Sequence, residues 1–185
     1  MARNGVADAP LLLSIGAASA LHLLWNDPDR AWHVTPMARD EVRSEPTRSE
    51  LSRALLNGRL AIAGLDAESE TELQLFAHWS SLVHAGEAEA IAIALSRGWV
   101  VGLEDPGAQR KVTRAAGAEH WINSATLLVT AVRQGRMTIA EADAVFGQLD
   151  CYGGYRKRGI GTIEGLIPLR AHPGGGVGCR PGSGS

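Results

Sequence analysis

Two pairs of acidic residues lie on either side of one short apolar run in the middle of the chain. Glu87 and Glu89 open a helical segment, and Glu104 and Asp105 follow the apolar residues 99–103. Strand ends and helix starts meet along one edge of a parallel sheet, so we expect the four carboxylates to gather there. Carboxylates brought together repel one another unless a cation holds them, and Mg²⁺ prefers oxygen ligands. The segment therefore predicts a site for Mg²⁺ or Mn²⁺.

Each acidic pair also has a plainer structural explanation. Glu87 and Glu89 at a helix start complement the helix dipole. Asp105, placed directly before a proline, is a typical N-cap residue. Taken in isolation, each pair fits these ordinary roles better than a metal site, and the metal hypothesis depends on the surrounding pattern.

Short apolar runs alternate with longer helical segments along the chain, which is typical of a parallel sheet covered by helices. We expect strands near residues 11–13, 31–34, 60–63, 99–103 and 120–122. We expect helices near residues 37–45, 47–57, 66–82, 86–97, 106–116, 124–134 and 138–148. The predicted fold is α/β, a three-layer α/β/α sandwich with a central parallel sheet.

The composition indicates one globular domain in a reducing compartment. The chain has 185 residues, of which 45% are hydrophobic and 21% charged, with a net charge of -2. This charge excludes a generally basic nucleic-acid-binding coat but permits a local basic face. Cys151 and Cys179 lack metal-ligand spacing, and we expect a cytoplasmic protein. Residues 10–24 are too short and polar for a membrane span, although they also resemble a secretory leader.

The character of the sequence changes after Asp150. Residues 151–185 contain a glycine-rich run without sustained periodicity. We therefore expect a domain over residues 1–150 and a flexible tail over residues 151–185. Residues 155–158 add an aromatic and basic segment, for which a solvated tail is a better explanation than contact with nucleic acid.

The order of the motifs resembles the PIN-domain nucleases of the VapC-like kind over residues 11–148. The segment GEAEAIAIALSRGWVVGLEDPGAQRKV resembles that family's GEAEAIALA helix, its following strand, and an Asp-led turn with an arginine five residues on, here Asp105 and Arg110. WINSATLLVTAVRQGRMT resembles the family's Gly-Thr turn and following helix, and VTPMARDEVRSE places the second acidic ligand at Glu41.

The sequence departs from the family pattern at its first strand. Family members resemble LLLDTGALSAL, whereas this chain has LLLSIGAASAL, which puts Ser14 at the position of the first metal-binding aspartate. A shift by one turn would put Ala17 there, and the acid is missing in either alignment. The third acidic position carries Glu89 in place of aspartate, with Glu87 as an added acid nearby.

The resemblance implies a metal-dependent endoribonuclease that hydrolyses RNA, such as the toxin of a toxin–antitoxin pair. It implies Glu41, Glu89 and Asp105 as catalytic metal ligands. Glu87 and Glu104 are additional candidates, either to bind a second ion or to orient a water. Arg110 and Arg114, four residues apart on a helix, are candidates for binding substrate phosphate, although exposed helical arginines are at least as often simply solvated.

The family also implies a homodimer and an antitoxin protein as partners, and no membrane. A second functional hypothesis assumes no catalysis. It rests on Ser14, which would take the place of an anionic metal ligand. The chain is then a catalytically silent PIN-like module that binds RNA or a protein.

Glu41 lies beside Arg39 and Arg43, so an ordinary salt-bridged helix face explains this glutamate equally well.

Overall fold

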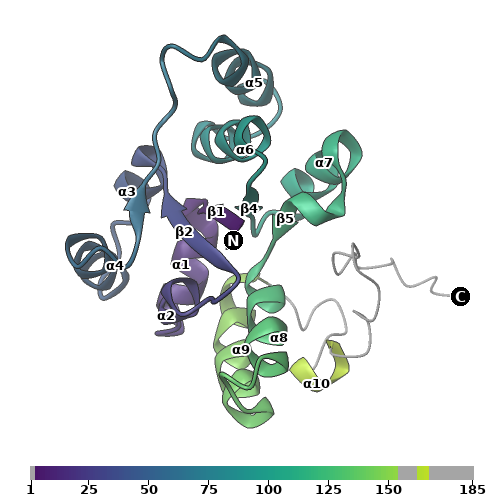
Figure 1. Ribbon diagram of the computed structural model, residues 1–185. Helices are drawn as coiled ribbons and strands as arrows, with labels where there is room; N and C mark the ends of the chain where they lie inside the picture. Colours follow the sequence, from purple (N-terminus) through teal and green to yellow (C-terminus); the bar gives the residue numbers. More distant parts are fainter. Residues whose placement is uncertain (1–2, 154–161, 167–185) are drawn as a thin grey trace, which may run out of the picture.

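The computed structural model describes residues 3–153 and 162–166 of the chain. Its centre is a five-stranded sheet in which every pair of neighbours is parallel, in the order β3-β2-β1-β4-β5 (Figure 1). The strands are β1 (Arg3–Ala7), β2 (Arg30–Val34), β3 (Ala61–Ile62), β4 (Val100–Gly102) and β5 (Trp121–Ile122). The expected α/β architecture with a central parallel sheet is confirmed.

Helices cover both faces of this sheet (Figure 1). They are α1 (Ala9–Ala17), α2 (His22–Trp25), α3 (Pro36–Glu41), α4 (Thr47–Leu56), α5 (Glu70–Ser80), α6 (Ala85–Arg97), α7 (Pro106–Ala116), α8 (Ser124–Arg133), α9 (Ile139–Gly153) and α10 (Ile163–Leu166). Side chains of α1, α4, α8 and α9 share one apolar core, and those of α6 and α7 share a second. Val6 and Ala7 of β1 point into different cores, because successive strand residues face opposite sides.

The strand expected at residues 11–13 is wrong, because these residues lie in α1. The first strand is β1, and Asp8 follows it directly. Asp8 Oδ1 accepts a hydrogen bond from the Leu11 backbone N–H at 2.7 Å, which makes Asp8 the N-cap of the helix. Leu11, Leu12 and Ile15 are buried on one helical face, so the apolar run is a helical stripe rather than a strand.

Most of the other expected elements lie close to their predicted positions. The helix expected from residue 66 begins later, at Glu70, because Ser69 caps it. Ser69 Oγ accepts from the Glu72 N–H at 3.3 Å. Thr138 and Glu141 form the reciprocal hydrogen bonds of a capping box at the start of α9.

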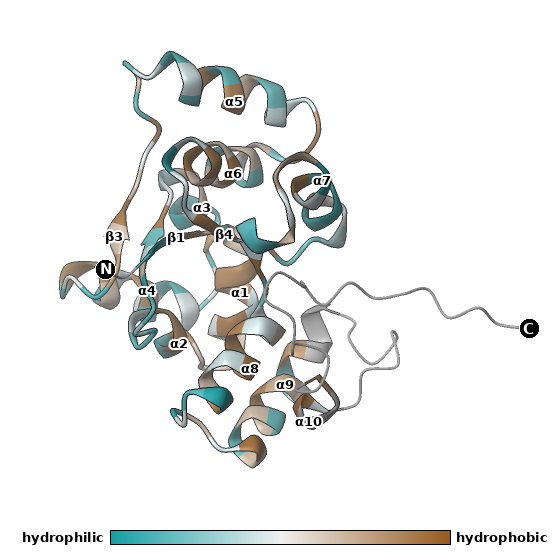
Figure 2. Ribbon diagram, turned by 45° about the vertical axis from the view of Figure 1, so that its right-hand side comes forward, coloured by the Kyte–Doolittle hydropathy of each residue, from teal (hydrophilic) through white to brown (hydrophobic). Residues whose placement is uncertain are grey.

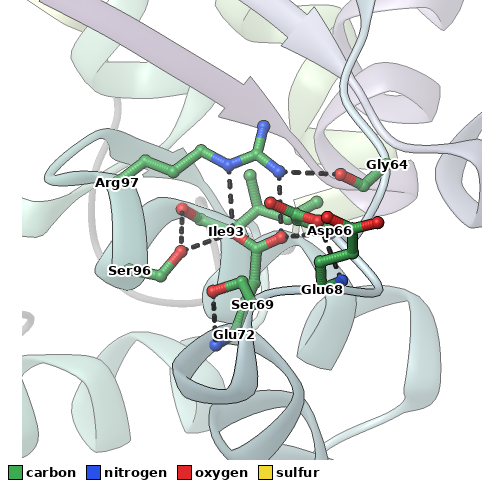
Figure 3. Close-up of polar contacts among 8 residues, drawn as sticks. All are labelled: Gly64, Asp66, Glu68, Ser69, Glu72, Ile93, Ser96 and Arg97. Atoms are coloured by element: carbon green, nitrogen blue, oxygen red, sulfur yellow. Dashed lines mark hydrogen bonds and ion pairs between the residues drawn. The ribbon is translucent and has the colours of Figure 1, made fainter.

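A partly buried ion pair fixes α5 against α6 (Figure 3). Arg97 donates from Nε and one terminal nitrogen to the two carboxylate oxygens of Glu72, each at 2.9 Å. The same terminal nitrogen donates to the Gly64 carbonyl at 2.8 Å. Glu72 also accepts from Ser96 Oγ and the Asp66 N–H, both at 2.6 Å. The start of α5 and the preceding loop are thus anchored to the end of α6.

The end of the described chain packs onto the domain. Helix α9 continues to Gly153, and Ile163 and Leu166 of α10 are buried in the core shared by α8 and α9. The rest of the segment predicted as a tail, residues 154–161 and 167–185, lies outside the described residues. In the part of the chain that is described, no helix combines the length and apolar character needed to cross a membrane.

Candidate acidic site

Asp8 lies at the carboxyl end of the central strand and is completely buried. Its backbone N–H donates to the Gly102 carbonyl at 3.1 Å, so the ends of β1 and β4 meet at this residue. Oδ1 caps α1, whereas Oδ2 has no hydrogen-bond partner among the described residues. A buried carboxylate oxygen without a hydrogen-bond partner lowers the stability of the folded protein. Its presence therefore indicates a functional role for Asp8.

Other carboxylates surround Asp8. Burial raises the pKa of Asp8 well above its ordinary value, and the negative charges of Glu104, Glu87 and Glu41 raise this pKa further. The hydrogen bond from Leu11 only partly opposes these effects. Asp8 is therefore the centre of an acidic cluster, which we define as Asp8, Glu41, Glu87, Glu104 and Asp105.

Glu41 reaches the cluster from the last residue of α3. Its carboxylate lies against the backbone of Gly86 in the first turn of α6, where a Cβ atom would come within 2.6 Å of Glu41 Oε1. The absence of a side chain at residue 86 leaves the space that this carboxylate occupies. The contact supports the predicted placement of Glu41 near the helix that carries Glu87.

Glu87 is nearly buried in the first turn of α6 and accepts from the His84 N–H at 3.3 Å. Burial raises the pKa of Glu87, and the charge of Asp105 adds to the rise. The His84 N–H and the positive charge of Lys111 act in the opposite direction. Glu87 therefore connects the acids at the end of β1 with Asp105 after β4.

The acids after β4 are held by two helix starts. Glu104 Oε1 accepts from the Ser124 N–H at 2.7 Å, at the first residue of α8. Asp105 Oδ2 accepts from the Ala108 N–H at 2.6 Å, so Asp105 is the N-cap of α7, as its plainer interpretation predicted. Gln109 Nε2 donates to the carbonyls of Leu103 and Glu104 and fixes the backbone between them.

Glu89 takes a different place from the other predicted ligands. It is buried, and its Oε2 accepts from the Met37 N–H at 3.0 Å, at the start of α3. This contact joins α6 to α3, and the acids that most raise the pKa of Asp8 are Glu104, Glu87 and Glu41. Glu87 therefore belongs to the acidic cluster, whereas Glu89 holds the start of α3.

The prediction that Ser14 occupies the strand-end position is wrong, because Ser14 lies inside α1, six residues beyond Asp8. Its buried Oγ has no hydrogen-bond partner among the described residues. Arg110 and Arg114 are both exposed on α7.

Sequence reasoning missed Asp8 because three consecutive leucines suggested a strand. The signal that could have found it is the Asp-Ala-Pro sequence after residues 3–7, since aspartate is a favoured N-cap and proline is favoured in the first helical turn. Read this way, the leucines begin a helix and Asp8 ends a strand.

The acidic cluster suits a divalent cation chemically. A cation would give Asp8 Oδ2 a partner and would offset the repulsion that raises the pKa of Asp8 and Glu87. As the side chains stand, no three histidine, cysteine, aspartate or glutamate residues in the described part of the chain form a ready ligand set for a metal. The donors fit Mg²⁺ or Mn²⁺ by type, and ligation requires side-chain movement.

A cleft of about 520 Å³ opens beside the cluster, lined by residues 81–84, Glu87, Asp105 and Lys111. The Nζ atom of Lys111 donates to the Leu82 carbonyl. The cleft therefore holds the positive charge of Lys111 together with Glu87 and Asp105, two acids of the cluster.

Comparison of the chain with protein-family models and with curated proteins finds no match.

Proposed function

We propose that the chain is a metal-dependent endoribonuclease of the PIN-like kind. The observation that carries this proposal is the acidic cluster around the unpartnered Oδ2 of Asp8, at the carboxyl ends of β1 and β4. Ligand sites of open parallel sheets gather at this edge. The strand order and the motif order around Glu87 and Asp105 support the same proposal.

The revised ligand set differs from the sequence-based one at two positions. Asp8, which was not predicted, takes the place of Ser14, and Glu89 is left out because it holds the start of α3. Asp8, Glu41 and Glu104 would hold the ion, with Glu87 and Asp105 beside them. Carboxylates with water and substrate oxygens satisfy the coordination that Mg²⁺ prefers.

A bound ion supplies two effects in phosphodiester hydrolysis: it acidifies a water and offsets charge on the phosphate oxygens. The residues of the chain supply the rest. Asp8 and Glu104 are anchored by hydrogen bonds with the starts of α1 and α8, which limits their reorganisation. Glu87 has a raised pKa, which makes its carboxylate a better proton acceptor for the attacking water.

The position of Asp8 removes the reason for the hypothesis of a catalytically silent module. It depended on a serine at the end of the first strand, whereas Asp8 occupies that position. Absence of cleavage by the wild type in the experiment below would favour the silent module.

The test is cleavage of single-stranded and structured RNAs by protein that has been treated with a chelator and then supplied with Mn²⁺. We expect cleavage by the wild type and a loss of at least about 100-fold in the Asp8→Asn and Glu104→Gln variants, because each removes an anionic ligand. Glu68→Gln is the matched control, since Glu68 is exposed in the loop before α5. Absence of cleavage by the wild type, or equal cleavage by Asp8→Asn, would overturn the proposal.

A further inference from the structure

We propose that the cleft beside the acidic cluster is a ribonucleotide subsite in which Lys111 binds a substrate phosphate. The proposal rests on the proposed function and assigns it a substrate-binding residue. Arg110 and Arg114, which the sequence suggested for this role, lie on the same helix but do not line the cleft.

The size and position of the cleft suit a substrate group next to the cleaved bond. Its volume of about 520 Å³ falls within the range of small-molecule sites. Residues 81–84, between α5 and α6, line it together with Asp105 and Lys111 of the α7 region. Glu87 lines it as well, so a nucleotide held here has its phosphodiester beside the acidic cluster.

Lys111 has donors to spare for a phosphate. Its ammonium group has three N–H donors, and one of them is directed to the Leu82 carbonyl. No carboxylate in the described residues lies within ion-pair distance of Lys111 Nζ. The contact with Leu82 holds the lysine across the cleft, with its remaining N–H groups available to an anion.

The cleft also offers apolar surface. Leu82 is 41% exposed and Val83 is half-buried, and both line the cleft near the lysine. A ribonucleotide combines an apolar base face with an anionic phosphate, and proteins that bind single strands pair these two features with packing surface and positive charge. Because the acids alone would repel a phosphate, the positive charge of Lys111 at this position favours binding.

The experiment measures binding of a short, fluorescently labelled single-stranded RNA by anisotropy over a range of monovalent salt concentrations. The protein is treated with a chelator and no metal is added, so that the RNA is not cleaved during the measurement. We expect Lys111→Gln to weaken binding by at least about tenfold. We also expect the slope of log affinity against log salt to decrease by about 0.7, the value for one phosphate contact on a single strand. Lys111→Arg should restore the slope.

Two further variants keep the test specific. Arg53→Gln removes an equal charge from the exposed face of α4, away from the cleft, and should leave affinity and slope unchanged. Leu82→Ser keeps the lysine, so it should weaken binding without a change of slope. An unchanged slope in Lys111→Gln, or the same loss in Arg53→Gln, would overturn the subsite.

Calorimetry with Mn²⁺ alone separates this proposal from the proposed function. Wild type and Lys111→Gln should bind the metal equally well if the lysine acts on substrate. If the wild type binds Mn²⁺ and cleaves RNA while the slope of Lys111→Gln equals that of the wild type, only the subsite fails. If the wild type neither binds Mn²⁺ nor cleaves, the proposed function fails.

Discussion

At the scale of single residues, Asp8 performs two tasks that conflict energetically. One oxygen stabilises α1 as its N-cap, and the other is buried among negative charges without a partner. The raised pKa means that the ionised form of Asp8 is less stable in the folded protein than in the unfolded chain. Such a conflict is typical of functional sites, where stability is given up for chemistry.

Replacement of Asp8 by asparagine should therefore stabilise the metal-free protein. Asparagine keeps the capping oxygen but removes the charge, so we expect the free energy of unfolding at neutral pH to rise. Mn²⁺ should raise the thermal midpoint of the wild type but not that of Asp8→Asn. Thermal unfolding followed by circular dichroism, with and without Mn²⁺, measures both effects.

The pH dependence gives the control for this prediction. The folded state binds more protons than the unfolded state above the ordinary Asp pKa of 3.8, so the contribution of Asp8 to stability falls as pH rises through the raised pKa. The stability difference between Asp8→Asn and the wild type should thus be small below pH 3.8 and grow above it. A variant that is less stable than the metal-free wild type at neutral pH would contradict this account.

Gly86 tests the placement of Glu41. In Gly86→Ala the new Cβ would lie 2.6 Å from Glu41 Oε1, so the glutamate must move away from the cluster. We expect Mn²⁺ affinity, measured by calorimetry, to fall by about tenfold. The fold should be retained, because the displaced group is the end of an exposed side chain.

Gly64→Ala is the matched control for Gly86→Ala. Its Cβ would meet Pro36 at 3.6 Å, an ordinary van der Waals contact, and it lies outside the acidic cluster. Unchanged metal affinity in both variants would show that Glu41 takes no part in the site.

At the scale of elements, the ion pair between Glu72 and Arg97 joins α5 to the helix that carries Glu87. Glu72 is only 2% exposed and accepts four hydrogen bonds, from Arg97, Ser96 and Asp66 (Figure 3). Burial raises its pKa, but the hydrogen bonds from these partners outweigh burial and leave the pKa lowered. The pair sets where α5 lies, and with it residues 81–84 of the cleft.

Glu72→Gln should lower the free energy of unfolding by about 2 kcal/mol, because it weakens the charge-assisted hydrogen bonds that the buried Glu72 accepts from the partly exposed Arg97 guanidinium. Urea unfolding measures this loss. Glu45→Gln is the matched control, since its ion pair with Arg48 is exposed and its loss should change the free energy of unfolding little. Similar losses in the two variants would show that burial of the Glu72 pair is unimportant.

At the scale of the whole molecule, the acidic cluster depends on the parallel sheet. The hydropathy view shows apolar segments on α1 and α6, whose side chains form the cores on the two faces of the sheet (Figure 2). Asp8, Glu41, Glu87 and Glu104 come from four separate segments of the chain. They meet because β1 and β4 are neighbours and end at the same edge of the sheet.

Metal binding should therefore protect distant segments together. We expect Mn²⁺ to slow amide hydrogen exchange at the start of α1, the start of α6 and the start of α8, whose N–H groups hold or adjoin the cluster. Exchange in α5 should change little. Protection confined to α6 alone would contradict a shared site.

The sequence by itself determined the fold class, the positions of most helices and the acidic character of the segment from Glu87 to Asp105. These features depend on local patterns: hydrophobic periodicity, caps such as Thr138 with Glu141, and acids next to an apolar run. The same patterns could not assign Leu11–Leu13 to helix or strand, because short apolar runs fit both.

Only the tertiary structure decided which carboxylates meet. Glu87 and Glu89 are two residues apart, yet one lies in the acidic cluster and the other binds the start of α3. Likewise, the position of Asp8 next to the end of β4 follows from the placement of β1 between β2 and β4. Contacts of this kind depend on strand order and helix rotation, which arise from packing between parts of the chain far apart in sequence.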